Sequence, residues 1–252
     1  MEEKNNGSSP VLVSIVIATF NAAERLPYCL QSIRELGSDR IEIVIVDGNS
    51  TDNTIEIAQM CGYPRITILS EPDKGIYDAY NKGAHIASGK WIHFLGSDDL
   101  VLPGYIEIMK FLDDEQVIHY ANSEPYYLGD GRPDYILLGG KFSKYRLAKY
   151  PVNHQAVLYP ASVFRSFSYD LRYRIFADYA MNIKLWGHPD FKIAYHPLFI
   201  VKYNMNGFSS TQTDLVFKKE KPALIRKHLG WWIYWKFRWK KYRKKMEGNK
   251  NW

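Results

Sequence analysis

The stretch VLVSIVIATFN, residues 11–21, carries the pattern on which the fold of the chain is built. Its first eight residues are almost all apolar and rich in β-branched side chains, which is typical of a buried strand. The polar residues Thr19 and Asn21 end this run, and residues 22–36 then place apolar side chains at helical spacing before Gly37. The stretch therefore predicts a strand, a polar loop and a helix in succession.

The same unit recurs over the next eighty residues. IEIVIVDG (41–48) and RITILS (65–70) read as strands, followed by helices at about 51–61 and 76–87, and KWIHFL (90–95) reads as a fourth strand. These strands are apolar throughout instead of alternating, which indicates a parallel sheet covered on both faces. We expect an α/β fold with a mostly parallel, Rossmann-like central sheet flanked by helices.

Polar side chains stand where each of these strands ends. In parallel sheets, ligands bind at the carboxyl ends of the strands. We therefore expect one site, built from carboxylates and amides of four loops, that contains Thr19, Asn21, Asp47, Asn49, Glu71, Asp73, Asp98 and Asp99.

The adjacent acids Asp98 and Asp99 need a partner, because like charges this close repel each other. A hard divalent cation such as Mg²⁺ or Mn²⁺, which takes oxygen ligands from carboxylates and substrate phosphates, fits that need. The chain has neither a P-loop nor a Gly-x-Gly-x-x-Gly motif after the first strand, so both kinds of phosphate-binding loop are disfavoured. Asp47 is placed to hold a base or ribose edge.

Residues beyond 100 follow a looser pattern. We expect helices at 103–112, 161–166 and 177–186, strand-like pieces at 116–121 and 135–140, and one or two closing strands at 191–204. The pattern does not indicate how these strands pair.

The 252 residues are 46% hydrophobic, enough to bury a core without disulfide support. The two cysteines, Cys29 and Cys61, form neither a disulfide framework nor a metal-binding spacing, which favours a reducing cytoplasm. The N-terminus lacks the features of a signal peptide, and no run is long enough to span a membrane. These features predict a cytoplasmic protein.

The basic charge is concentrated near the C-terminus. Residues 218–245 hold twelve lysines or arginines against one acid, so the rest of a chain with a net charge of +6 is acidic. On a single helix one face would carry Leu224, Trp231, Trp235, Trp239, Tyr242 and Met246. Such a helix suits an anionic membrane surface, with packing on the body or on a second subunit, or plain solvation, as alternatives. Nucleic acid is disfavoured, because the body is acidic and no nucleic-acid motif is present.

Four segments resemble the successive motifs of the family-2 glycosyltransferases, inverting enzymes of the GT-A fold, and especially members of bacterial polysaccharide assembly. They are VSIVIATFNAAERLPYCLQSI (13–33), IEIVIVDGNSTDNT (41–54), EPDKGIYDAYNKG (71–83) and GKWIHFLGSDD (89–99). The resemblance covers about residues 11–215 and implies that Asp99 and Asp98 bind a divalent metal. Ser97 stands at the leading position of the DxD-type motif, and Phe20 stands where the family often has tyrosine.

The resemblance also assigns residues to the donor and to catalysis. NHQAVLY (153–159) and FADYAMNIKLW (176–186) resemble the acceptor-side segment and the catalytic helix of the family, which makes Asp178 the general base. Read by itself, Asp178 could instead cap the helix that it opens. The donor-binding residues implied are Thr19, Phe20, Asn21, Asp47, Asn49, Asp73, Lys74, Asn81, Asp98, His154 and Gln155.

Together these features predict a GT-A domain at residues 10–215, with a nucleotide-sugar half (10–100) and an acceptor half (101–215), and a membrane-association tail at 216–252. We expect a metal-dependent transfer from a nucleotide-sugar to a lipid-linked saccharide in surface-polysaccharide biosynthesis, at the inner face of the cytoplasmic membrane. A nucleotidyltransferase, or a catalytically silent nucleotide-binding protein anchored by the tail, are the alternatives. The chain could also form an oligomer.

Overall fold

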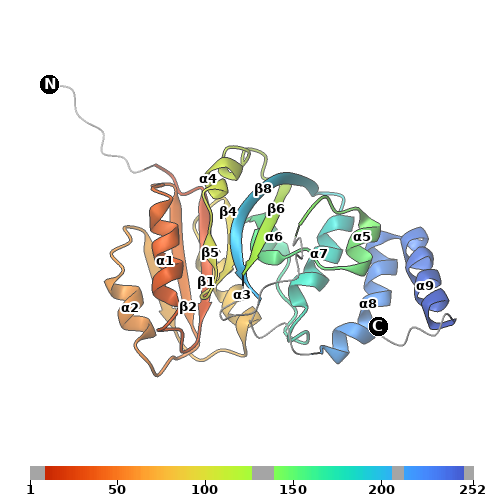
Figure 1. Ribbon diagram of the computed structural model, residues 1–252, viewed down its shortest axis with the longest axis horizontal. Coiled ribbons are helices and arrows are strands. Elements are labelled where there is room, and N and C mark those ends of the chain that lie inside the picture. The colour runs from red at the N-terminus through yellow and green to blue at the C-terminus, as the bar shows by residue number, and fades with distance from the viewer. Residues whose placement is uncertain (1–8, 127–138, 206–212, 247–252) are drawn as a thin grey trace.

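The computed structural model describes residues 9–126, 139–205 and 213–246 (Figure 1). Its described strands form one eight-stranded sheet in the order β3-β2-β1-β4-β7-β6-β8-β5. The four parallel strands are β1 (Val13–Thr19), β2 (Ile41–Asp47), β3 (Ile66–Ser70) and β4 (Trp91–Gly96). The predicted parallel sheet of the first half is confirmed, and all four strands end at the same edge.

Helices cover both faces of this sheet, as the continuous apolar strands predict. They are α1 (Leu26–Glu35), α2 (Thr54–Met60) and α3 (Ile76–Ile86). Helix α2 begins three residues later than expected, because Asp52 Oδ1 accepts a hydrogen bond from the Thr54 amide and holds the preceding residues in a turn. Along β1, Val16 packs toward α3, whereas Ile15 and Ile17 belong to the core under α1.

Helix α3 crosses β1 very closely. A β-carbon on Gly83 would lie 2.3 Å from Cγ1 of Val16, so this helix position has no room for a side chain.

The second half completes the sheet with antiparallel pairs that the sequence did not indicate. Strand β7 (Val157–Pro160) runs antiparallel to both β4 and β6 (Val117–Tyr126). The closing segment is one long strand, β8 (Lys192–Asn204), parallel to β6 and antiparallel to the short β5 (Leu100–Val101). The strand expected at 135–140 falls mostly outside the described residues.

Short helices connect these strands. They are α4 (Gly104–Met109), α5 (Lys144–Lys149), the 3-10 turn η1 (His154–Ala156), α6 (Val163–Ser166) and α7 (Ala177–Gly187). Helix α7 is buried along nearly its whole length and places Asp178 near its start.

The C-terminal segment is two helices joined by a break. Helix α8 (Leu215–Leu224) runs into a π turn, η3 (Ile225–Leu229), and α9 (Trp231–Met246) follows Gly230, whose φ of 97° interrupts the helix. The expectation of one helical face from Leu224 to Met246 is therefore wrong. Three side chains of α8 and η3 are buried in the core, namely Phe217, Ile225 and Leu229.

The contact between α7 and η3 depends on a glycine. A β-carbon on Gly187 would lie 1.7 Å from the carbonyl oxygen of His228, which only a glycine permits. The segment 217–229 thus packs on the sheet domain, and α9 lies at the far end of the molecule (Figure 1).

Candidate active site

Asp98 and Asp99 follow β4 and are held by the end of β8. The Asn204 backbone amide donates to Asp99 Oδ1 at 2.7 Å, and Asn204 Nδ2 donates to Asp98 Oδ2 at 2.8 Å. The Tyr126 hydroxyl donates to the Asp98 carbonyl oxygen. The last residue of β8 therefore fixes both carboxylates, more than 100 residues away in the chain.

Asp47, at the end of β2, is hydrogen-bonded to residues at the ends of β1 and β3 and in its own loop. It is fully buried and accepts hydrogen bonds from the hydroxyls of Thr19 and Ser70, each at 2.9 Å, and from the amide and hydroxyl of Ser50 at 2.8 and 2.5 Å. Burial raises the pKa of Asp47, but the bonds from Ser50, Thr19 and Ser70 outweigh it and lower the pKa overall. Asp47 is therefore charged, and its carboxylate holds these strand ends together.

Residues of the β1 loop frame an open surface beside this carboxylate. Asn21 adopts a φ of 49°, and its Oδ1 accepts from the Thr51 amide at 2.9 Å, which joins the first two loops. Phe20 is 65% exposed. A β-carbon on Gly48 would lie 2.7 Å from Asp73 Oδ2 and 3.5 Å from the Phe20 ring, so these three residues lie together. The Phe20 ring offers a free face for stacking.

The other residues assigned to donor binding differ in their exposure and in their hydrogen bonds. Asn49 (φ 66°) and Lys74 are exposed. Asn81 uses both ends of its amide on the Tyr169 backbone, at 2.8 and 2.9 Å, and so joins α3 to the segment before α7. Gln155 Oε1 accepts from the Gly96 amide at 3.0 Å, beside the acid pair. Their donor roles stay predictions.

Asp178 is held by two side chains from other elements. It is 7% exposed, its Oδ1 accepts from the Tyr77 hydroxyl at 2.7 Å, and its Oδ2 lies 3.3 Å from His154 Nδ1. Helix α7 begins without a side-chain cap, so capping does not explain this carboxylate. Burial and the Asp178 charge hold the pKa of Tyr77 well above its usual range, so Tyr77 stays a donor.

A cavity of about 250 Å³ opens against Asp178. Its walls are mainly aromatic and apolar, with the exposed Arg174 among them. Two buried polar atoms here, the Tyr80 hydroxyl and His154 Nε2, have no hydrogen-bond partner among the residues that the structure describes. The lining residues are Ile76, Tyr77, Tyr80, Pro151, Val152, Asn153, His154, Arg174, Ile175, Phe176, Asp178, Tyr203 and Met205.

The sequence of residues 14–171 matches the family model described as Glycosyl transferase family 2. This chain belongs to that family. A PGL/p-HBAD biosynthesis glycosyltransferase of Mycobacterium tuberculosis is 33% identical over 223 residues, which cover 85% of this chain and 86% of the relative. The uncharacterized glycosyltransferase YibD of Escherichia coli is 30% identical over 116 residues, 44% of this chain and 34% of YibD.

Solved structures share the fold of this glycosyltransferase. S. aureus TarS 1-349 in complex with UDP-GlcNAc matches with a TM-score of 0.67 and 15% identity, over 86% of this chain and 66% of that one. The mannosyltransferase PcManGT from Pyrobaculum calidifontis, with GDP-Man and Mn²⁺, matches with a TM-score of 0.59 and 17% identity, over 77% and 59%. This chain spans 43% of the longer TarS chain. The predicted GT-A fold and family are confirmed.

The acid pair of this glycosyltransferase fits a divalent cation. Asp99 is 1% exposed, and within the described ranges its Oδ2 accepts no hydrogen bond. A β-carbon on Gly96 would lie 2.4 Å from that oxygen and 3.0 Å from Asp98 Oδ1, so both carboxylates face the same small space. Burial, with the Asp98 charge adding to it, raises the pKa of Asp99 to about 7.

A cation at the acid pair would take further ligands from phosphates and water. Within the described ranges, no group of three His, Cys, Asp or Glu side chains is placed to hold a metal. Two carboxylates with substrate phosphates are a usual ligand set for Mg²⁺.

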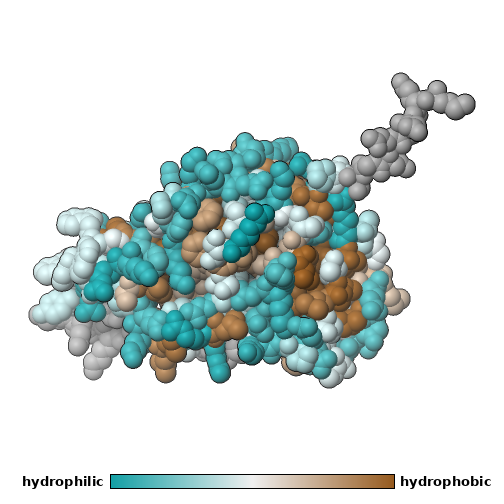
Figure 2. All heavy atoms as spheres, turned by 180° about the vertical axis from the view of Figure 1, so that it is seen from behind, coloured by the Kyte–Doolittle hydropathy of each residue, from teal (hydrophilic) through white to brown (hydrophobic). Residues whose placement is uncertain are grey.

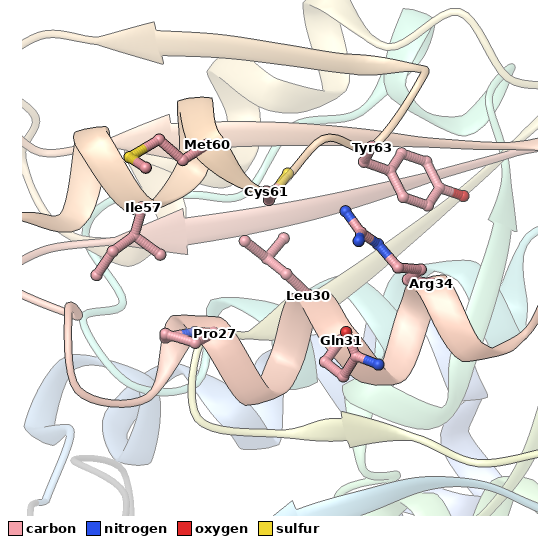
Figure 3. Close-up of a pocket in the computed structure, with 8 residues that line it drawn as sticks. All are labelled: Pro27, Leu30, Gln31, Arg34, Ile57, Met60, Cys61 and Tyr63. Carbon is pink, nitrogen blue, oxygen red and sulfur yellow. The ribbon is translucent and has the colours of Figure 1, made fainter.

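A second cavity, of about 330 Å³, lies between α1 and α2 (Figure 3). It contains no carboxylate, and its lining is mostly apolar, from Pro27, Leu30, Gln31, Arg34, Ile57, Met60, Cys61 and Tyr63. It therefore offers none of the chemistry that the glycosyltransferase needs.

Sequence reasoning missed several residues of the site. Ser50, Ser70 and Asn204 hold the predicted carboxylates, and Tyr77 holds the predicted base. Ser50 and Ser70 stand directly in the strand-end loops, so their position could have indicated them. Nothing local marks Asn204 or Tyr77, whose partners come from distant parts of the chain.

Proposed function

We propose that this glycosyltransferase moves a sugar, with inversion, from a nucleotide-sugar to a hydroxyl of a lipid-linked saccharide in surface-polysaccharide biosynthesis. The observation that carries the proposal is Asp178, a nearly buried carboxylate on the wall of a mainly aromatic and apolar cavity. Structural neighbours in complex with UDP-GlcNAc, and with GDP-Man and Mn²⁺, support a nucleotide-sugar donor and a divalent cation.

On the donor side, Phe20 stacks on the base, and the Thr19–Asp47 loops form its pocket. Asp99 and Asp98, whose carboxylates face the same small space, would hold the divalent cation. When bound, the cation stabilises the negative charge of the departing diphosphate.

On the acceptor side, Asp178 takes the proton of the acceptor hydroxyl as that oxygen attacks the anomeric carbon. The new C–O bond forms on the face opposite the bond to the diphosphate, which breaks. Tyr77 and His154 hold the carboxylate toward the cavity, through contacts of 2.7 and 3.3 Å. A general base of this kind contributes roughly 10²–10⁴-fold to the rate.

The tail supports a membrane-held acceptor. Trp231, Trp232, Trp235 and Trp239 are each more than half exposed on α9, among lysines and arginines. Aromatic and basic residues on one helix bind the headgroup region of anionic membranes. In the described part of the chain, each helix is too short or too polar to cross a bilayer. We place the enzyme at the inner face of the cytoplasmic membrane.

Turnover of candidate donors with Mn²⁺ tests this function. Release of nucleoside diphosphate from one nucleotide-sugar, lost in Asp178→Asn but with donor binding kept, is the expected result. Binding of every donor without any turnover, even with lipid-linked saccharides present, would favour the silent binding protein. Release of inorganic pyrophosphate from a nucleoside triphosphate supplied with a sugar phosphate, and no turnover of any nucleotide-sugar, would favour the nucleotidyltransferase.

A further inference from the structure

Helices α5 and α9 lie side by side at one end of the molecule (Figure 1) and bring four cations together. Arg146 and Lys149 come from α5, and Lys236 and Lys240 come from α9. The Lys149 and Lys236 ammonium groups each lie 4.6 Å from the centroid of the same ring, that of Tyr145. We call these four residues the α5–α9 cluster.

No carboxylate offsets this charge in the part of the chain that the structure describes. Among the described residues, the Arg146 guanidinium donates only to backbone oxygens, of Gly139 at 2.6 Å and Lys141 at 3.1 Å. Elsewhere on the surface lysines and arginines do find acids, as Lys82, Lys192 and Arg172 show. The cluster is thus an unusual concentration of uncompensated charge.

The pKa of Lys149 reflects this crowding. Burial lowers it first, and the charges of Lys240, Lys236 and Arg146 lower it further. Like charges held this close destabilise the fold unless an anion binds between them.

The cluster also has a defined place relative to the acceptor cavity and the tryptophans. Helix α5 ends at Lys149, and the cavity wall begins at Pro151. On α9, the exposed Trp235 and Trp239 adjoin Lys236 and Lys240 in sequence. Seen from behind, this end of the molecule is coloured teal to white, whereas hydrophobic residues gather toward the end with the N-terminus (Figure 2).

We propose that the α5–α9 cluster binds the phosphate groups of anionic phospholipids, so that α5 docks on the membrane together with the tail. Phospholipid is the occupant that supplies many phosphates beside an apolar layer, and the cluster offers cations beside exposed tryptophans. The inference rests on the proposed membrane-held acceptor and adds a second element to the attachment. It places the membrane surface next to the acceptor cavity.

The test measures sedimentation of the full-length protein with phosphatidylcholine vesicles, with and without phosphatidylglycerol. The variant Lys149→Gln/Lys236→Gln removes two cluster charges, and Lys218→Gln/Lys219→Gln removes two exposed charges from α8 as a matched control. We expect the cluster variant to bind anionic vesicles roughly 10-fold or more weakly, and the control to change a few-fold at most. Unchanged nucleotide-sugar hydrolysis shows that the variants are folded.

Three outcomes would overturn the inference. Equal losses of vesicle binding in the two double variants would mean that binding depends on total charge and not on the position of the cluster. Loss of binding in Trp235→Ala/Trp239→Ala, with none in the cluster variant, would leave the membrane attachment standing and remove α5 from it. Stabilisation of the wild type by inorganic phosphate, lost in the cluster variant but without any anionic-vesicle binding, would assign the cluster to a free anion. Sugar transfer is measured separately, so each failure is distinguishable from failure of the proposed chemistry.

Discussion

The Tyr77 hydroxyl on α3 donates to Asp178 Oδ1 on α7 at 2.7 Å, across 101 residues of sequence. Helix α3 belongs to the proposed nucleotide-sugar half and α7 to the proposed acceptor half, so one hydrogen bond links the two. The Tyr77 hydroxyl shares this proton with the Ile175 carbonyl oxygen, 2.5 Å away, just before the start of α7. The orientation of the proposed base thus depends on a residue of the donor motifs.

Tyr77→Phe should lower kcat about 10-fold while leaving donor affinity within a few-fold, since the ring still packs but the carboxylate loses a donor. Tyr105→Phe, which removes another buried hydroxyl outside the lining of the cavity, is the control. Equal losses of kcat in the two variants would mean that Tyr77 acts only through packing.

Asp178→Asn should lower sugar transfer by roughly 10²-fold or more and leave donor affinity nearly unchanged. The amide keeps the size of the side chain but cannot take a proton. Single-turnover rates and donor titration separate the two effects. A parallel collapse of donor affinity would show that Asp178 belongs to the donor site instead.

Asp99→Ala should abolish transfer and the Mn²⁺ dependence of nucleotide-diphosphate binding. Asp98→Ala should cost less, because Asp99 is the more buried of the two and its Oδ2 has no hydrogen-bond partner among the described residues. In the wild type, Mn²⁺-dependent binding should weaken as pH falls below about 7, where a proton competes for Asp99. Thermal shifts with nucleotide diphosphates measure both effects. Mn²⁺-dependent binding that survives in Asp99→Ala would contradict the metal assignment.

His93 should make the protein sensitive to acid. Burial lowers its pKa to about 4, although the Gln155 carbonyl oxygen, 2.7 Å from Nε2, opposes the shift. As the pH falls, the unfolded chain therefore binds a proton at His93 before the folded chain does. The free energy of unfolding should fall by about 3 kcal/mol between about pH 6.5 and pH 4. Denaturant unfolding should show a flatter pH dependence in His93→Leu, and the same slope as wild type in His85→Gln, an exposed control.

Two truncations separate the buried and exposed parts of the tail. A cut after Asp214 removes Phe217, Ile225 and Leu229 from the core, each worth about 1.5–3 kcal/mol, so the protein should unfold at much lower temperature. A cut after Gly230 removes only α9 and should keep donor hydrolysis while losing attachment to anionic vesicles. Equal stability of the two truncated forms would mean that α8 and η3 add little to the core.

The carboxylates of the site show which features the local sequence predicts and which it does not. Asp47, Asp98 and Asp99 could be placed at one edge because parallel strands all end there, and the apolar runs before them identify the strands. Asn204, which holds Asp98 and Asp99, could not be placed, because β8 reaches them only through a pairing of β8 with β5 and β6. Such pairings join segments far apart in the chain, which local periodicity does not indicate.

The residue pattern predicts the parallel half of the sheet, its flanking helices and the types of residue at the strand ends. These follow from periodicity and composition, which act over a few residues at a time. Three features are visible only in the folded molecule: the Tyr77–Asp178 contact, the break at Gly230 and the burial of Phe217 and Ile225. These features depend on packing between segments distant in the chain. The neighbours of such a side chain depend on how the whole core packs, and not on the residues beside it in sequence.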